Sequence, residues 1–159
     1  MKKRYIVAAT VGIFVLLSVN ALFVAKEKQE TKDLYVGSGG RGVVHVGEAT
    51  FRVDIADTRE KRGLGLSGRP QLADGEGMLF VFPSSGKYPF WMKDMNFPLD
   101  IIWIDEHHTI VYIAPFLTPE SYPTAYAPEG NAQYVLEVSA GTAAAKGMVV
   151  GEAVTFGDE

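Results

Sequence analysis

Cysteine is absent from all 159 residues of the sequence. Disulfide bonds, thiol nucleophiles and thiolate metal sites are therefore excluded, and the fold must be held together by its core alone. Basic residues are also scarce beyond the first 33 positions. Residues 34–159 hold 9 Lys and Arg against 16 Asp and Glu, a net charge of −7, whereas the whole chain carries −4. This acidic balance argues against nucleic acid or anionic lipid as the main partner.

Charge is missing altogether from residues 5–25. A helix needs about 20 apolar residues to cross the hydrocarbon core of a membrane. The basic residues 2–4 precede this stretch, so we expect the N-terminus in the cytoplasm and the rest of the chain outside it. We interpret residues 1–25 as a signal anchor that forms one transmembrane helix. The alternative is a signal peptide cut after Ala21 or Ala25, which would leave the protein secreted.

The rest of the chain divides by composition into a linker and a domain. Residues 26–42 combine mixed charge with glycine, which is typical of a flexible linker. Residues 43–159 are long enough for one domain of ordinary size. The predicted organisation is therefore a membrane helix, a flexible linker and one extracytoplasmic domain.

The domain is predicted to be mainly β. Residues 49–56 alternate strictly between apolar and polar side chains, the pattern of a half-buried strand. Further strands are predicted at 77–82, 89–93, 99–104, 109–113, 132–138 and 154–156, with turns at 83–86 and 105–108. Many short strands between Gly and Pro turns favour a small β-sandwich or a partly closed barrel.

Two short helices complete the prediction. Asp57 followed by Glu60 forms a capping-box pattern, which indicates a helix that ends near residue 66. A single helical turn is predicted at 142–146.

Two arginines lie beside the first helix. We expect Arg62 and Arg69 to form bidentate hydrogen bonds with carboxylates and so to hold the helix on the sheet. The candidate partners are Asp54, Asp57 and Glu76. Recruitment of an anionic ligand is the alternative role for these arginines.

Residues 89–105 mix large apolar side chains with charges. An ionised group in apolar surroundings costs several kcal/mol unless it is paired. The presence of these charges therefore suggests that they have a structural or functional role. Aromatic faces beside fixed charges are typical of small-molecule sites, and the proline-rich loop 115–128 could cover one. The candidate ligand-binding residues are Trp91, Lys93, Asp94, Asp100, Glu76, Tyr122 and Tyr126. The alternative is that Trp91 and Met92 belong to the core and that Lys93 and Asp100 form a structural ion pair across neighbouring strands.

Hydrolysis by a carboxylate pair is a second hypothesis, in which Asp100 acts with Glu76 or Asp94. No carboxylate spacing here is diagnostic, and no Gly-x-Ser-x-Gly elbow accompanies Ser84 and Ser85. We therefore assign no catalytic residue.

A copper site is a third hypothesis, because thioether and imidazole ligands suit Cu(I). Its ligands would be Met78, Met92, Met95, His107 and His108. Core methionines and a solvated turn explain the same residues, so we expect no metal and no cofactor.

Five motifs follow one another in a recognisable order. They lie at 57–69, 76–83, 90–93, 98–101 and 134–138. Together they resemble the domain-of-unknown-function 192 family, also known as UPF0127-like. The resemblance implies a mainly β, sandwich-like fold in a small extracytoplasmic domain, and it brings no established activity. Relatives often carry a Pro-Cys pair in the long loop, where this chain has Tyr122 and Pro123.

The function that we expect is a non-catalytic binding or accessory module of the cell envelope. Its partner would be a glycan, a peptide or another protein. A carboxylate-dependent envelope hydrolase is the alternative.

Overall fold

The structure is a computed structural model that describes residues 40–157. The predicted membrane segment at 1–25 lies outside the described residues. Among residues 40–157, none of the helices is long and apolar enough to cross a membrane.

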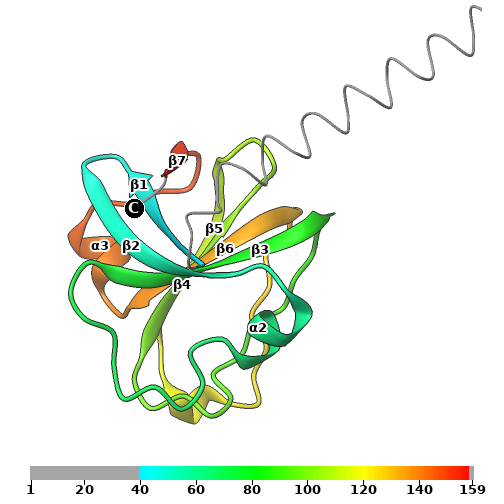
Figure 1. Cartoon of the computed structure of the whole chain (residues 1–159), viewed down its shortest axis with the longest axis vertical. Helices are drawn as coiled ribbons and strands as arrows, with labels where there is room; N and C mark the ends of the chain where they lie inside the picture. Colours follow the sequence, from blue (N-terminus) through cyan, green and yellow to red (C-terminus); the bar gives the residue numbers. More distant parts are fainter. Residues whose placement is uncertain (1–39, 158–159) are drawn as a thin grey trace, which may run out of the picture. The chain divides into compact units, whose positions relative to one another are not determined.

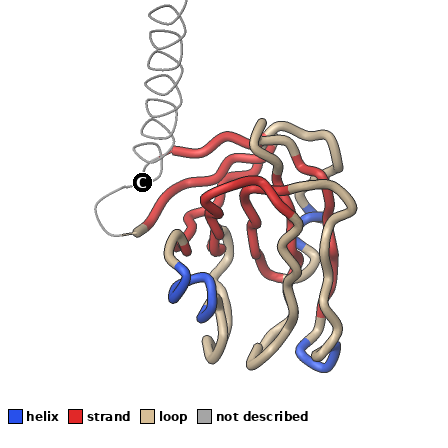
Figure 2. Tube along the Cα trace, turned by 90° about the vertical axis from the view of Figure 1, so that its right-hand side faces the viewer, coloured by secondary structure: helices blue, strands red, loops and turns tan. Residues whose placement is uncertain are grey.

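Seven strands and two short helices make up the described domain (Figure 1). The strands are β1 (Arg41–Val46), β2 (Ala49–Ala56), β3 (Glu76–Gly86), β4 (Leu99–Ile104), β5 (Ile110–Leu117), β6 (Ala132–Ser139) and β7 (Val154–Gly157). The helices are α2 (Arg59–Leu64) and α3 (Thr142–Ala145), and a 3-10 turn, η1, spans Pro119–Ser121. The tube in Figure 2 shows that strands dominate and that the helical segments lie at the margins of the sheet.

All seven strands form one curled sheet in the order β5-β4-β6-β3-β2-β1-β7. Strands β2 and β3 are parallel, and the other neighbours are antiparallel. The curl brings the two edge strands together at one end. There the Ile110 N–H donates to the Glu152 carbonyl at 2.9 Å, and the Val154 N–H donates to the His108 carbonyl at 2.8 Å. The sheet is therefore a half-barrel, which is the second of the two predicted architectures.

Both faces of the central strands are buried. All six residues of β4 are buried, and the five that are apolar are divided between two hydrophobic clusters. Ile102 and Ile104 join the cluster inside the curl, whereas Ile101 and Trp103 join the cluster on the opposite face. Because strand side chains alternate in direction, a continuous apolar run supplies both faces. The outer face of β3, β4 and β6 carries the site described below.

The first residues of α2 differ from the prediction. Thr58 is the N-cap, and its hydroxyl accepts a hydrogen bond from the Lys61 N–H at 3.2 Å. Asp57 instead binds the Lys61 ammonium group at 2.8 Å. Partial burial raises the pKa of Asp57, but the hydrogen bond from Lys61, a backbone hydrogen bond and the nearby positive charges together outweigh it and lower the pKa. The helix ends at Gly65, whose φ of 53° favours glycine.

Most predicted strands are confirmed, and those at 49–56 and 99–104 have the predicted bounds. Two local predictions are wrong. The predicted turn at 83–86 belongs to β3, whose pairing with β6 shifts register and resumes at Gly86. The predicted strand at 89–93 forms only a single bridge, between Phe90 and Tyr126. Within residues 40–157, no neighbouring strand extends that bridge into a ladder, so this segment is a loop whose side chains contact the outer face of the sheet.

Candidate functional site

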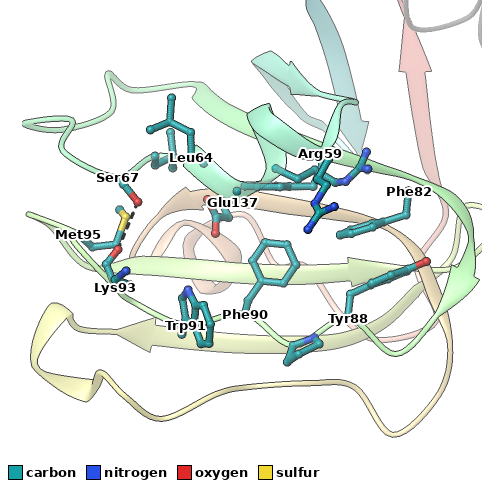
Figure 3. Close-up of a pocket in the computed structure, with 16 residues that line it drawn as sticks. Arg59, Leu64, Ser67, Phe82, Tyr88, Phe90, Trp91, Lys93, Met95 and Glu137 are labelled. Carbon is teal, nitrogen blue, oxygen red and sulfur yellow. Dashed lines mark hydrogen bonds between the residues drawn. The ribbon is translucent and has the colours of Figure 1, made fainter.

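A cavity of about 290 Å³ lies between α2, the loop after β3 and the outer face of the sheet. Helix α2 and the residues that follow it supply Arg59, Arg62, Gly63, Leu64, Gly65, Leu66 and Ser67. The sheet supplies Phe80, Phe82 and Glu137, and the loop supplies Tyr88, Pro89, Phe90, Trp91, Lys93 and Met95. Figure 3 shows these side chains converging from the three segments.

Glu137 is a buried acid in the wall of this cavity. In β6 it is paired with Met78 of β3 on one side and with Ile101 of β4 on the other. Its side chain is 5% exposed, and within residues 40–157 its carboxyl group has no hydrogen bond or ion pair. Burial raises its pKa to about 8, because an apolar environment disfavours the charged form. At neutral pH, Glu137 is therefore an uncharged carboxylic acid that can donate a hydrogen bond.

Aromatic rings form the walls around this acid. Phe90 meets Phe80 edge to face, with ring centroids 4.8 Å apart. Phe82 and Tyr88 are stacked at 3.6 Å. Trp103 fixes the backbone here, since its indole N–H donates to the Tyr88 carbonyl at 2.9 Å. These rings give the cavity flat, apolar walls with a defined shape.

Three cations line the cavity, and they differ in how they are held. The Arg62 guanidinium donates to the carbonyls of Asp57 and Val81, both at 2.7 Å, and lies over the ring of Phe82. Lys93 is exposed and its ammonium group lies 3.9 Å from the Asp94 carboxylate. Arg59 is exposed and makes no hydrogen bond or ion pair with the described residues.

Residues 42–156 match the model of the DUF192 family, which is described as an uncharacterized ACR. The chain belongs to the DUF192 family. A search of curated proteins finds no match.

Two solved structures are similar to this DUF192 domain. One is a Sinorhizobium meliloti protein provisionally named a transcription regulator; it is 29% identical, with a TM-score of 0.67, and the match covers 73% of this chain and 92% of that one. The other is a Novosphingobium aromaticivorans protein of unknown function; it is 31% identical, with a TM-score of 0.67, and the match covers 72% of this chain and 83% of that one.

Four of the predicted site residues lie at or beside the cavity of this DUF192 domain. Trp91 and Lys93 line it. Tyr122 packs edge to face against Trp91, with centroids 6.4 Å apart, and so brings the long loop to the mouth. Tyr126 exchanges two backbone hydrogen bonds of 2.8 Å with Phe90 and fixes that loop to the cavity wall.

Asp100 does not line the cavity. It is fully buried, and its carboxylate accepts hydrogen bonds from the backbone N–H groups of Phe116, Gly141 and Ala143 at 2.8–3.0 Å. The alternative prediction of a Lys93–Asp100 ion pair is therefore wrong. Backbone donors satisfy this carboxylate without any cation.

Asp94 and Glu76 also lie apart from the cavity lining. Asp94 is exposed at a positive φ of 55°, and its carbonyl accepts from the Gly68 N–H at 2.9 Å. Glu76 lines a separate hollow of about 100 Å³ and accepts from the Ala73 N–H at 3.3 Å. The structure does not bring the predicted carboxylates Asp100, Asp94 and Glu76 into one cavity.

The two arginines beside α2 have different partners. Arg69 donates to the Asp54 carboxylate at 2.6 Å and ties the segment after α2 to β2. Arg62 binds backbone carbonyl groups rather than a carboxylate. Arg69 therefore holds the chain after the helix, whereas Arg62 holds the helix against β3.

Three of the residues proposed as copper ligands are instead found in the hydrophobic core or packed against aromatic rings. Met78 and Met92 are buried in the core. His108 is not fully solvated, because its ring packs on Tyr134 and Phe156, and burial lowers its pKa. Within residues 40–157, no cluster of three or more His, Cys, Asp or Glu side chains could hold a metal ion.

Sequence reasoning overlooked Glu137 and Arg59. The signal for Glu137 was present, because it is the only charged residue in the mostly apolar strand at 132–138. A carboxyl group at the centre of a buried strand must lose its charge or find a partner. No comparable signal marks Arg59, which stands in a helix rich in charge.

Proposed function

We propose that this DUF192 domain is a non-catalytic binding module that holds a small organic molecule in the cavity under α2. The observation that carries the proposal is the position of Glu137. A buried, uncharged carboxyl group without a hydrogen-bond partner faces a cavity with aromatic walls. A buried polar group without a hydrogen-bond partner is energetically unfavourable, and a bound ligand can supply that partner.

The content of the cavity favours binding over hydrolysis. Acid–base cleavage of a glycosidic bond requires two carboxyl groups on either side of the bond. Among the described residues that line the cavity, Glu137 is the only one with an acidic side chain. The raised pKa of Glu137 would suit a general acid, and this observation keeps the envelope hydrolase as the second candidate.

The cell envelope is the proposed place of action. This part of the proposal is supported by the uncharged stretch at 5–25 and by the basic residues before it. The molecule bound would then be an envelope compound, such as part of a glycan or peptide, or a small metabolite that reaches this compartment.

A thermal-shift screen of the full chain against sugars, short peptides and small organic acids tests the proposal. A ligand that binds only the folded state raises the melting temperature as RT ln(1 + [L]/Kd) predicts. We expect at least one class to give a shift that is lost in Glu137→Leu. Glu129→Gln, an exposed acid outside the cavity, is the control that should keep it.

Mass spectrometry of the recovered ligand separates the two candidate functions. An unchanged ligand after long incubation supports a binding module, and a cleaved product supports the hydrolase. A ligand whose shift persists in Glu137→Leu would contradict this cavity as the site.

A further inference from the structure

We infer that the ligand of this cavity is a small organic anion with a flat apolar body, which inserts a neutral hydrogen-bond acceptor toward Glu137 and leaves its negative group on Arg59. The inference rests on the proposed function, and it adds the chemical class and the orientation of the ligand.

The sign of the charge follows from the residues around the cavity. Its lining contains three cations, Arg59, Arg62 and Lys93, and a single acid, Glu137, which is uncharged at neutral pH. The sequence from residue 34 onward carries a net negative charge, with 16 acidic against 9 basic residues. A cavity lined by cations on an otherwise acidic protein attracts anions to that place.

Arg59 is the cation that remains available to a ligand. Arg62 is already held by two carbonyl groups and an aromatic ring. Lys93 lies near the carboxylate of Asp94. Arg59 has no partner in the part of the chain that the structure describes, and a guanidinium group binds a carboxylate through two parallel hydrogen bonds.

The orientation follows from burial. Glu137 lies at the sheet, under α2, and its uncharged form can donate one hydrogen bond. An ionised group placed beside it would lose its hydration among aromatic rings, so the inserted end must be neutral, such as a carbonyl oxygen. The charged end is then left near exposed Arg59, where water still reaches it.

The size of the cavity limits the body of the ligand. A volume of about 290 Å³ stands at the lower end of small-molecule sites, which run from about 300 to 1,000 Å³. The stacked and edge-on rings of Phe82, Tyr88 and Phe90 leave flat surfaces. One planar ring, or a chain of similar size, suits both features.

Three matched probes test the inference by calorimetric titration of the full chain. The first, 4-acetylbenzoate, has a carbonyl acceptor, a ring and an anion. The second, 4-ethylbenzoate, lacks the acceptor, and the third, 4-acetylbenzamide, lacks the anion. We expect the first probe to bind about tenfold more tightly than either of the others, the ratio that one charge-assisted or buried hydrogen bond supplies.

Two variants assign the two ends of the ligand. Arg59→Gln should abolish the preference for the benzoate over the benzamide, and Arg52→Gln, an exposed arginine outside the cavity, should keep it. Glu137→Leu should abolish the preference for acetyl over ethyl, whereas Glu137→Gln keeps a donor and should retain part of it. Circular dichroism establishes that each variant is folded.

The outcomes separate this inference from the proposed function. If the benzamide binds as tightly as the benzoate and both are lost in Glu137→Leu, the cavity binds ligands but the anionic class is wrong. An affinity for 4-acetylbenzoate that Arg59→Gln leaves unchanged overturns the orientation. If none of the three probes binds but a sugar or peptide binds in a way that requires Glu137, the inference is wrong and the proposed function is still supported.

Discussion

The carboxylate of Asp100 accepts a hydrogen bond of 2.8 Å from the backbone N–H of Ala143, which joins strand β4 to the short helix α3. The same carboxylate accepts from the N–H groups of Phe116, near the end of β5, and Gly141, in the turn after β6. One buried side chain thus connects three chain segments to β4. The three donors replace the water that the carboxylate loses on burial.

Replacing this carboxylate should destabilise the fold. In Asp100→Asn one oxygen becomes an amide group, which faces a backbone N–H and cannot accept its hydrogen bond. We expect the free energy of unfolding to fall by about 2–4 kcal/mol, since hydrogen bonds to a buried charged group are lost. Urea denaturation measures the change. Asp74→Asn, at an exposed position, is the control, and equal stability of the two variants would contradict the role of Asp100.

Replacing either of two glycines next to the candidate site by alanine should change the free energy of unfolding, but in opposite directions. A methyl group at Gly77 would lie 2.7 Å from the backbone oxygen of Glu137, which cannot move without breaking the β3–β6 ladder. We expect Gly77→Ala to lower the free energy of unfolding by about 1–3 kcal/mol. Gly63 lies in α2 with open space around it, so Gly63→Ala should raise stability by about 0.5–1 kcal/mol. Thermal unfolding of both variants under one condition gives the comparison; a loss of stability in both would contradict it.

Local sequence patterns predicted much of the fold, but they could not predict the pairing of strands that are far apart in the chain. The strands at 49–56 and 99–104 were predicted with their observed bounds, because alternation and a short, mostly apolar run are both local signals. The parallel pairing of β2 with β3, and the contact between the ends of β5 and β7, join residues far apart in the chain. No short stretch of sequence contains that information, so the prediction left both a sandwich and a partly closed barrel open.

The candidate site was predicted only in part for the same reason. Trp91 and Lys93 were found because a dense aromatic and charged segment is visible locally. Glu137 belongs to the cavity because α2 covers β6, and that relationship comes from tertiary packing. Asp100 looked similar to a ligand-binding acid in sequence, yet its partners are N–H groups up to 43 positions away. Residue type alone does not distinguish a carboxyl group that accepts hydrogen bonds from backbone N–H groups from one that faces a cavity.

Glu137 should make the protein less stable as pH rises. Its pKa is about 8 in the folded state, against an ordinary value of 4.5 that applies when the chain is unfolded. Between these values the unfolded state binds fewer protons than the folded state, so the free energy of unfolding falls with pH and levels off above about 8. In Glu137→Gln this contribution is absent. Urea denaturation of both proteins from about pH 4 to about pH 9 should show their difference shifting in favour of the variant, and parallel curves would rule out a raised pKa.

The same ionisation should weaken the binding of 4-acetylbenzoate. Above about pH 8 Glu137 loses the proton that it donates, and its negative charge then repels both the acceptor and the anion. The other ionisable groups that line the cavity are Arg59 and Arg62 on α2, and Tyr88 and Lys93 on the loop.

The pKa of Glu137 is about 8, so its ionisation sets the expected fall in affinity near that pH. Calorimetric titration should therefore give a falling affinity for the wild type and a flat profile for Glu137→Gln, whose amide donates at every pH. A wild-type affinity that is constant across this window would show that the bound ligand does not accept a hydrogen bond from Glu137, and the ligand would then have to contact another wall of the cavity.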